Sequence, residues 1–129
     1  MPKAIDLIVQ NGAAANKTFT LTSPAAGDGG VAQWALKEGT ISAVFPAFTS
    51  SSSSRSKGRN LKLKFTHPSS YTDATTGLTM VNNRAEINIS VSIPSDFPEA
   101  MKNDFVAYGV NLLNSAFVKS LIRDALPAT

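Results

Sequence analysis

Three shortages define what this chain can be: it has no cysteine, one histidine and few charged residues. Without cysteine, the chain can form no disulfide bond and offers no thiolate nucleophile or metal ligand. Charged residues make up 16% of its 129 residues, whereas a soluble globular domain carries about 25%. This scarcity predicts that much of the surface is hidden, for example against copies of the same chain. No apolar run approaches the roughly 18 residues that a membrane-spanning helix needs, so we expect no membrane partner.

The same shortages argue against catalysis. His67 could join Asp73 and a serine in a hydrolytic triad, but in a chain with so many serines this coincidence carries no weight. Metal sites need clustered histidines, cysteines or carboxylates, and the sequence has no such cluster. The glycines of residues 27–30 follow a proline loop and precede a strand, which is typical of a turn and not of a phosphate-binding loop. We therefore expect no enzyme, no metal and no cofactor.

The length suits one domain, residues 1–129. A chain of this length buries about two-thirds of the surface that its unfolded form exposes, which is enough for one core. The N-terminal segment has Asp6 inside its apolar run and lacks a signal-peptide cleavage pattern. We expect a mature protein, made and used in the cytoplasm.

Apolar and alternating runs come first along the chain and predict strands. The first two, residues 4–10 and 17–23, are joined by the turn-rich stretch NGAAAN and predict a hairpin. Two polar stretches, residues 50–59 and 69–79, predict loops. The other predicted strands are residues 31–38, residues 40–50 with a bulge or sheet edge at Pro46, residues 59–68 and residues 80–94.

Beyond residue 94 the apolar period changes to that of helices. Ser95 or Asp96 can cap a first helix. Ser115 interrupts the pattern, and residues 116–126 predict a second helix. The predicted fold is α+β, with an N-terminal β-hairpin at residues 1–23, an antiparallel β-sheet at residues 31–94 and two C-terminal α-helices at residues 95–127.

The net charge of +3 is unevenly distributed along the chain. Its whole positive excess lies within residues 55–64, which contain five basic residues and no acid. Such clustering favours a polyanionic partner over a diffuse basic surface. The five basic residues are Arg55, Lys57, Arg59, Lys62 and Lys64.

Side chains of residues 59–68 alternate between two faces, because a strand has a side-chain period of two. Leu61, Leu63 and Phe65 point one way, and Lys62 and Lys64 point the other way. The second face fits either a plain solvated sheet surface or a surface for nucleic acid, since amides, hydroxyls and lysines can bind bases and phosphates together. Its other predicted members are Thr40, Ser42, Asn60, Thr66, Asn88 and Ser90.

The apolar face of the sheet needs a cover. Trp34 shares a face with Leu36 and is predicted to lie in the core. Both predicted helices carry an apolar stripe, and they either fold back on their own sheet or cover the sheet of a partner copy. The residues predicted to pack in the core or the dimer interface are Leu61, Leu63, Phe65, Ile87, Ile89, Val91, Met101, Phe105, Tyr108, Leu112, Phe117 and Leu121.

Four short stretches occur in an informative order. They are NG at Asn11–Gly12, GVAQW at Gly30–Trp34, RNLKLKFTHP at Arg59–Pro68 and EINISVSIP at Glu86–Pro94. No single stretch is diagnostic, but together they span nearly the whole chain. This ordered set resembles the coat proteins of single-stranded RNA bacteriophages, the levivirus family.

The resemblance implies an intertwined homodimer with a continuous ten-stranded sheet, in which the helices of each chain pack over the sheet of its partner. Dimers of that family assemble in the bacterial host cytoplasm into an icosahedral T=3 shell, the virion capsid. The inner sheet face binds the RNA genome, and binding of one RNA hairpin represses translation of the replicase. The loop at residues 69–79 corresponds to the family's loop around the symmetry axes of the shell. The alternative is a small dimeric RNA-binding regulator that never assembles.

The resemblance also implies roles for particular residues. Lys62 and Lys64 fall at strand positions where family members place basic or hydroxyl side chains against RNA. Asn88 and Ser90 fall where the last strand contacts the RNA hairpin. The full predicted RNA-binding set is Thr40 and Ser42, on the strand that forms an adenine pocket in relatives, with Arg55, Lys57, Arg59, Asn60, Lys62, Lys64, Glu86, Asn88 and Ser90.

One position departs from the pattern of the family. Glu86 stands where the best-known relatives have a tyrosine that stacks on a base. Stacking of a base on an aromatic ring stabilises binding by about 1–3 kcal/mol. The departure therefore implies weaker or different hairpin recognition.

Overall fold

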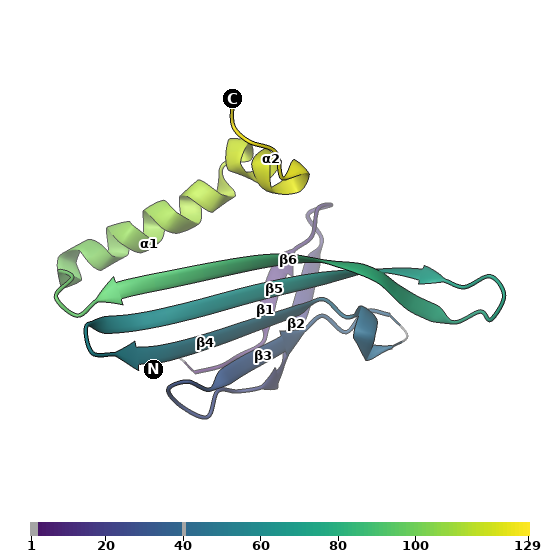
Figure 1. Ribbon diagram of the computed structural model, residues 1–129, viewed down its shortest axis with the longest axis horizontal. Helices are drawn as coiled ribbons and strands as arrows, with labels where there is room; N and C mark the ends of the chain where they lie inside the picture. Colours follow the sequence, from purple (N-terminus) through teal and green to yellow (C-terminus); the bar gives the residue numbers. More distant parts are fainter. Residues whose placement is uncertain (1–2, 40) are drawn as a thin grey trace. The chain divides into compact units, whose positions relative to one another are not determined.

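The computed structural model of the chain describes residues 3–39 and 41–129 (Figure 1). The chain separates into two compact units, one up to Pro94 and one from Ser95 onward. The first contains all of the strands and the second contains both helices. In chain order the elements are β1 (Leu7–Gln10), β2 (Asn16–Ser23), β3 (Val31–Ala35), the short 3₁₀ helix η1 (Ser42–Val44), β4 (Ala47–Arg55), β5 (Gly58–Thr72), β6 (Thr79–Pro94), α1 (Glu99–Asn114) and α2 (Ala116–Asp124).

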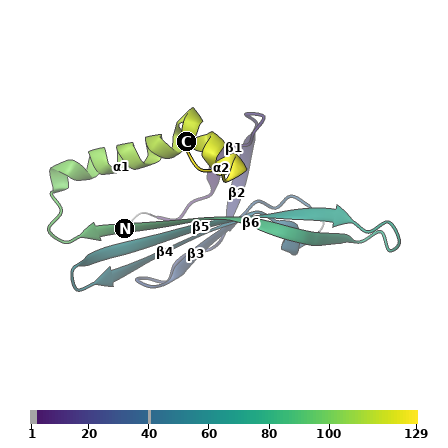
Figure 2. The ribbon, with the colours of Figure 1, turned by 45° about the horizontal axis from the view of Figure 1, so that its top comes forward.

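The six strands form one antiparallel sheet in chain order, from β1 to β6. This arrangement, followed by two helices, confirms the predicted α+β fold. The first part of β2 pairs with β1, and its last part, from Thr20, pairs with β3, with a shift of register between Leu21 and Ser23. Figures 1 and 2 both show that the β1–β2 hairpin runs across the direction of the long strands β4, β5 and β6.

The predicted N-terminal hairpin is confirmed, and its turn is held by one side chain. The Asn11 carboxamide oxygen accepts hydrogen bonds from the backbone N–H groups of Ala13 and Ala15, at 2.9 and 3.0 Å. Ala14 has a φ of 60°, a left-handed conformation that is uncommon for a residue other than glycine. The asparagine thus takes over hydrogen bonds that the backbone of the turn cannot make to itself.

The core of the sheet unit lies where β2, β3 and β4 meet. Its buried members are Phe19, Ala32 and Trp34, so the predicted core position of Trp34 is confirmed. The Trp34 ring lies 5.4 Å from that of Phe48, and its Nε1–H donates to the backbone oxygen of Ile5 at 2.8 Å. A buried indole needs such an acceptor, because an unpaired N–H away from water is costly.

The predicted strand at residues 40–50 is wrong in its first half. Residues 42–44 form the 3₁₀ turn η1, and β4 begins at Ala47. Pro46 has no N–H to donate to a ladder, and it instead accepts a hydrogen bond from the Leu36 N–H at 2.9 Å. The proline therefore marks the start of the strand and not a bulge inside it.

The predicted loop at residues 50–59 is also wrong. The five consecutive serines belong to β4, which pairs with β3 on one side and β5 on the other. Ser51, for example, lies between Val31 and Lys62. Serine has a low strand propensity, but pairing on both sides outweighs this preference. A turn at residues 56–57 then leads into β5.

Gly58 is required by the turn between β4 and β5. Its φ is 156°, and a Cβ atom built there would collide with the backbone oxygen of Ile93 on β6. The backbone of β6 therefore approaches the start of β5 too closely for any side chain.

The loop predicted at residues 69–79 is shorter than expected, because β5 continues to Thr72 and β6 begins at Thr79. The remaining residues, 73–78, form a compact turn. The carboxylate of Asp73 accepts from the Thr75 N–H at 2.8 Å, and the Asp73 backbone oxygen accepts from the Gly77 N–H at 2.7 Å. Polar composition identified a turn but not its ends.

Both predicted helices are present, but their boundaries differ. The predicted caps Ser95 and Asp96 are wrong, since the N-cap of α1 is Pro98 and it makes no side-chain capping bond. Ser115 caps α2, where its hydroxyl accepts from the Val118 N–H at 3.3 Å, and α2 ends at Asp124. Neither helix has a buried residue.

No single helix in the described part of the chain is long and apolar enough to cross a membrane. Only the pair of α1 and α2 together, which is bent by 59°, passes that test by length and composition.

Candidate nucleic-acid interface

The register of β4, β5 and β6 divides the side chains of the sheet between two faces. Lys62 of β5 lies between Ser51 of β4 and Ser90 of β6. Lys64 lies in the same way between Thr49 and Asn88. Residues directly opposite in an antiparallel pair share a face. We name this surface the polar face; its members are Thr49, Ser51, Ser53, Arg55, Asn60, Lys62, Lys64, Thr66, Arg84, Glu86, Asn88, Ser90 and Ser92.

Hydroxyl and amide groups cover the centre of the polar face, and basic side chains stand among them. Lys62 and Lys64 are exposed on β5, and Arg84 is exposed on β6 opposite Pro68. Arg55 ends β4. The polar face, as defined by these strands, thus carries four basic residues and one acid, Glu86. Its net charge is +3.

Glu86 forms an ion pair with one of these basic residues. Its Oε1 atom lies 3.4 Å from the Nζ atom of Lys64, and the two side chains are 44% and 48% exposed. An exposed pair of this kind contributes little to stability, about 0–1 kcal/mol. It does, however, offset part of the positive charge of Lys64, whereas Lys62 has no such ion pair in the described part of the chain.

Asn60 links the end of the polar face across three strands. With its carboxamide turned to suit its neighbours, its oxygen accepts from Arg55 Nε at 2.7 Å. Its nitrogen then donates to the Ser92 hydroxyl at 3.2 Å. The Arg55 guanidinium is thereby held beside the polar face, where its remaining N–H groups can meet an anion.

Arg59 does not join the lysines, so the predicted grouping of all five basic residues is wrong. It belongs to the alternate set that contains Leu61 and Leu63, on the opposite face of β5. There it pairs with the carboxylate of Asp28, and it donates to the Ser52 hydroxyl at 3.1 Å. Together with a hydrogen bond from the Gly29 N–H to the Ser52 oxygen at 2.7 Å, this pair ties the loop before β3 to β4.

Two other predicted RNA-binding residues, Lys57 and Ser42, are not on the polar face. Lys57 is exposed in the turn between β4 and β5. Ser42 lies in η1 and not on a strand, so its predicted place on the sheet is wrong. The physical reason is that the backbone turns before Pro46, and pairing with β3 and β5 starts only at Ala47. Thr40 lies outside the described residues.

The opposite face of the sheet is apolar, as predicted. Leu61, Leu63 and Phe65 of β5 share it with Ile89 and Val91 of β6. Phe65 packs against the Phe19 ring, with the two centroids 6.1 Å apart. Most of this face remains partly open. The predicted dimer residues among the exposed hydrophobic side chains are Ile87, Met101, Phe105, Tyr108, Leu112 and Phe117.

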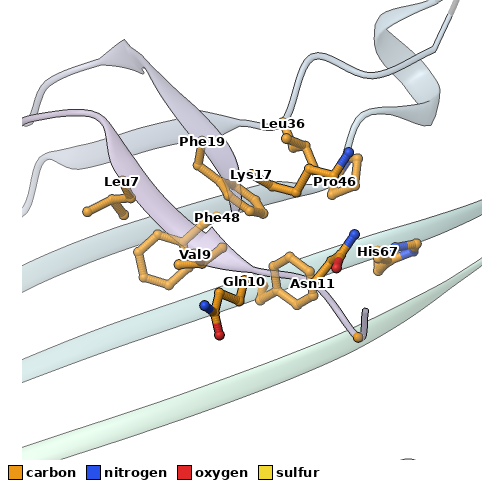
Figure 3. A pocket seen from close by; sticks show the side chains of 12 residues that line it. Leu7, Val9, Gln10, Asn11, Lys17, Phe19, Leu36, Pro46, Phe48 and His67 are labelled. Carbon is orange, nitrogen blue, oxygen red and sulfur yellow. The ribbon is translucent and has the colours of Figure 1, made fainter. Parts of the chain in front are cut away.

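A pocket of about 460 Å³ opens on the apolar face, between the β1–β2 hairpin and the long strands (Figure 3). Its walls are mainly apolar, with the rings of Phe19, Phe48 and Phe65 among them. Lys17 and His67 stand at its polar end. Sequence reasoning did not find this pocket, because it depends on the angle at which the hairpin crosses the sheet.

The structure adds polar-face residues that sequence reasoning missed: Thr49, Ser51, Ser53, Arg84 and Ser92. The sequence held a signal for the serines of β4. Phe48 and Phe65 stand at equal distances along the chain from residues 56–57, as two paired residues of a hairpin do, and they do pair in the structure. For Arg84, the alternation of β6 already placed it on the side of Asn88.

Within residues 3–39 and 41–129, no group of three histidine, aspartate or glutamate side chains could hold a metal ion.

Solved structures share this fold. The chain superposes on the virus-like particle of bacteriophage NT-214 with a TM-score of 0.85 and 23% identity, over 99% of this chain and 100% of that chain. For the virus-like particle of Beihai levi-like virus 21 the TM-score is 0.85 and the identity 17%, with 99% of both chains covered. For the protein capsid of bacteriophage GA the values are 0.72 and 18%, with coverage of 93% and 94%.

No protein-family model and no curated protein sequence matches the chain. The likeness therefore lies in the arrangement of strands and helices. It confirms that this chain has the coat-protein fold of single-stranded RNA phages that the four sequence stretches predicted.

Proposed function

We propose that this chain is the structural coat protein of a single-stranded RNA bacteriophage. It dimerises, assembles into an icosahedral T=3 shell in the cytoplasm of a bacterial host, and binds RNA on the polar face of its sheet. The observation that carries the proposal is a sheet with one basic, hydroxyl-rich face and one apolar face, in a fold shared with phage capsid structures. The role is structural and not enzymatic.

The surface area of a single copy supports dimerisation. The chain exposes 9750 Å², whereas a folded monomer of its mass exposes about 6,600 Å². The excess is about 3,000 Å² for each chain, or about 6,000 Å² for two copies together, which is the scale of large obligate interfaces. Among the described residues, the buried hydrophobic core consists of Phe19, Ala32, Trp34 and Val44 alone.

The edge strand β6 supports a particular mode of dimerisation. Within the described residues the sheet ends at β1 on one side and at β6 on the other; β6 is the longer, with 16 residues, and pairs with β5 alone. An edge of this length offers a row of unpaired backbone groups to another chain. Pairing of β6 with β6 of a second copy would join β2 to β6 of both chains into ten strands. The apolar helices of each copy would then cover the apolar face and the pocket of its partner.

The polar face supports RNA as the anionic partner. Its net charge of +3 attracts phosphates, while its hydroxyl and amide groups offer the donors and acceptors that bind bases and riboses. We infer that this face lines the inside of the shell and binds the genome. Recognition of one hairpin, with repression of replicase translation, belongs to the same proposal.

Expression of the chain alone tests the proposal. We expect uniform particles in electron micrographs, and nuclease-resistant RNA inside them whose sequence can be read. Sedimentation separates the alternative, because a dimeric regulator that never assembles would bind RNA and remain at the size of a dimer. A soluble monomer under all assembly conditions would refute both dimerisation and assembly.

A further inference from the structure

Glu86 is out of place on a surface that binds phosphates. It is the one acid among the charged side chains of the polar face, where Lys64 and Arg84 lie near it on β5 and β6 and Lys62 lies further along β5. A carboxylate repels the phosphate groups of RNA, and it can only accept hydrogen bonds. Whatever part of the RNA lies at Glu86 must therefore offer donors and not negative charge.

The contacts of Glu86 leave it available to such a donor. Its Oε1 atom is 3.4 Å from Lys64 Nζ, and neither carboxylate oxygen accepts a closer hydrogen bond from any described residue. Its partner across the ladder is Thr66, with Asn88 the next residue on the same face of β6. A carboxylate that is 44% exposed and partly neutralised by a lysine can accept two hydrogen bonds side by side.

The unpaired edges of the four bases differ in what they offer to a carboxylate. Guanine presents two adjacent donors, N1–H and the N2 amino group, which match the two carboxylate oxygens. Adenine and cytosine each pair one amino donor with a ring nitrogen acceptor, which would face a carboxylate oxygen unfavourably. Uracil has one donor between two carbonyl acceptors. Single-stranded loops expose these edges to protein side chains.

We propose that Glu86 binds the Watson–Crick edge of an unpaired guanine, while Lys64 balances the charge of the carboxylate. Glu86 is then a residue that determines which RNA loops the polar face prefers. This inference rests on the proposed RNA-binding function of the same face.

The test compares three RNA stem-loops that differ at one loop position, which is guanine, inosine or adenine. Inosine keeps N1–H but lacks the N2 amino group, so it removes one of the two hydrogen bonds. Binding is measured by fluorescence anisotropy with the full-length chain, at a concentration where light scattering detects no particles. Because the position of the guanine within the loop is unknown, each loop position is scanned in turn. At one position we expect guanine to bind about tenfold more tightly than adenine, with inosine between them.

The variant Glu86→Gln keeps the size of the side chain but replaces one acceptor with a donor. We expect it to lose the preference for guanine. The matched control is Glu99→Gln on α1, which removes the same charge from another exposed pair, 2.8 Å from Lys102, and should keep the preference.

Two results would overturn the inference while leaving RNA binding intact. In one, no loop position shows a preference for guanine in the unchanged chain. In the other, Glu86→Gln raises the affinity for all three stem-loops by the same factor, which means that Glu86 only offsets the charge of Lys64. Failure of every stem-loop to bind is a different outcome, because it refutes the proposed function itself.

Discussion

Replacement of Lys62 by alanine tests whether the polar face meets phosphates. Lys62 is exposed at the centre of that face, between Ser51 and Ser90, and it forms no ion pair with a described residue. A lysine in this state can give its whole charge to a phosphate and release a counterion. Lys64 forms an ion pair with Glu86 at 3.4 Å. A contact between Lys64 and an RNA phosphate would therefore partly replace that ion pair.

The magnitude follows from counterion release. Each lost contact with single-stranded RNA lowers the slope of log affinity against log salt by about 0.7. Lys62→Ala should therefore bind RNA more weakly at low salt, and its deficit should shrink about 2.5-fold as salt rises fourfold. We expect a smaller change of slope for Lys64→Ala, because Glu86 already offsets part of that charge.

Anisotropy titrations at several salt concentrations measure the slopes, with the full-length chain below its assembly concentration. Lys3→Ala removes the same charge from an exposed position outside the strands and serves as the control. Lys62→Arg should keep the slope, since it keeps the charge. The reasoning is refuted if Lys62→Ala leaves the slope unchanged, or changes it no more than Lys3→Ala does.

Two further predictions concern the fold itself. Trp34→Ala removes a buried ring that packs on Phe48 and a hydrogen bond to Ile5. We expect the free energy of unfolding, measured by urea unfolding at fixed protein concentration, to fall by about 3–5 kcal/mol. A loss below about 1 kcal/mol would place the ring outside the core. Gly58→Ala should lower the free energy of unfolding by about 1–3 kcal/mol, because its Cβ would strike the backbone of β6. The control is Gly12→Ala, where no atom lies within 4 Å of a new Cβ, and an equal effect of both substitutions would contradict this account of Gly58.

Alternation was the most reliable signal in the sequence. It predicted that Leu61 and Leu63 share one face and Lys62 and Lys64 the other, because a strand must place successive side chains on opposite sides. The same rule applied to Arg59 would have separated it from the lysines. Arg59 lies where the predicted loop at residues 50–59 meets the predicted strand at residues 59–68, and the prediction grouped it with the lysines by charge and not by alternation.

The boundaries of strands were less predictable where composition opposed them. Serines 50–54 have little intrinsic preference for a strand, and nothing within that stretch marks it as one. Their conformation is decided by β5, which pairs with all five, and by β3, which pairs with Ser50 and Ser51; this pairing satisfies backbone hydrogen bonds of β4. The same holds for Ser69 to Thr72, which extend β5 because β6 lies beside them.

By itself the sequence determined the order of the elements, the two-faced character of β5 and β6, and the shortage of charge that points to association. These properties are local, since they depend on periodicity and composition along a single segment. The tertiary structure decided three others: that the serine run is a strand, that Arg59 pairs with Asp28 while Glu86 meets Lys64, and that β6 is left as an edge strand. Each of these depends on register between segments far apart in the chain, and register is fixed only when the strands pair.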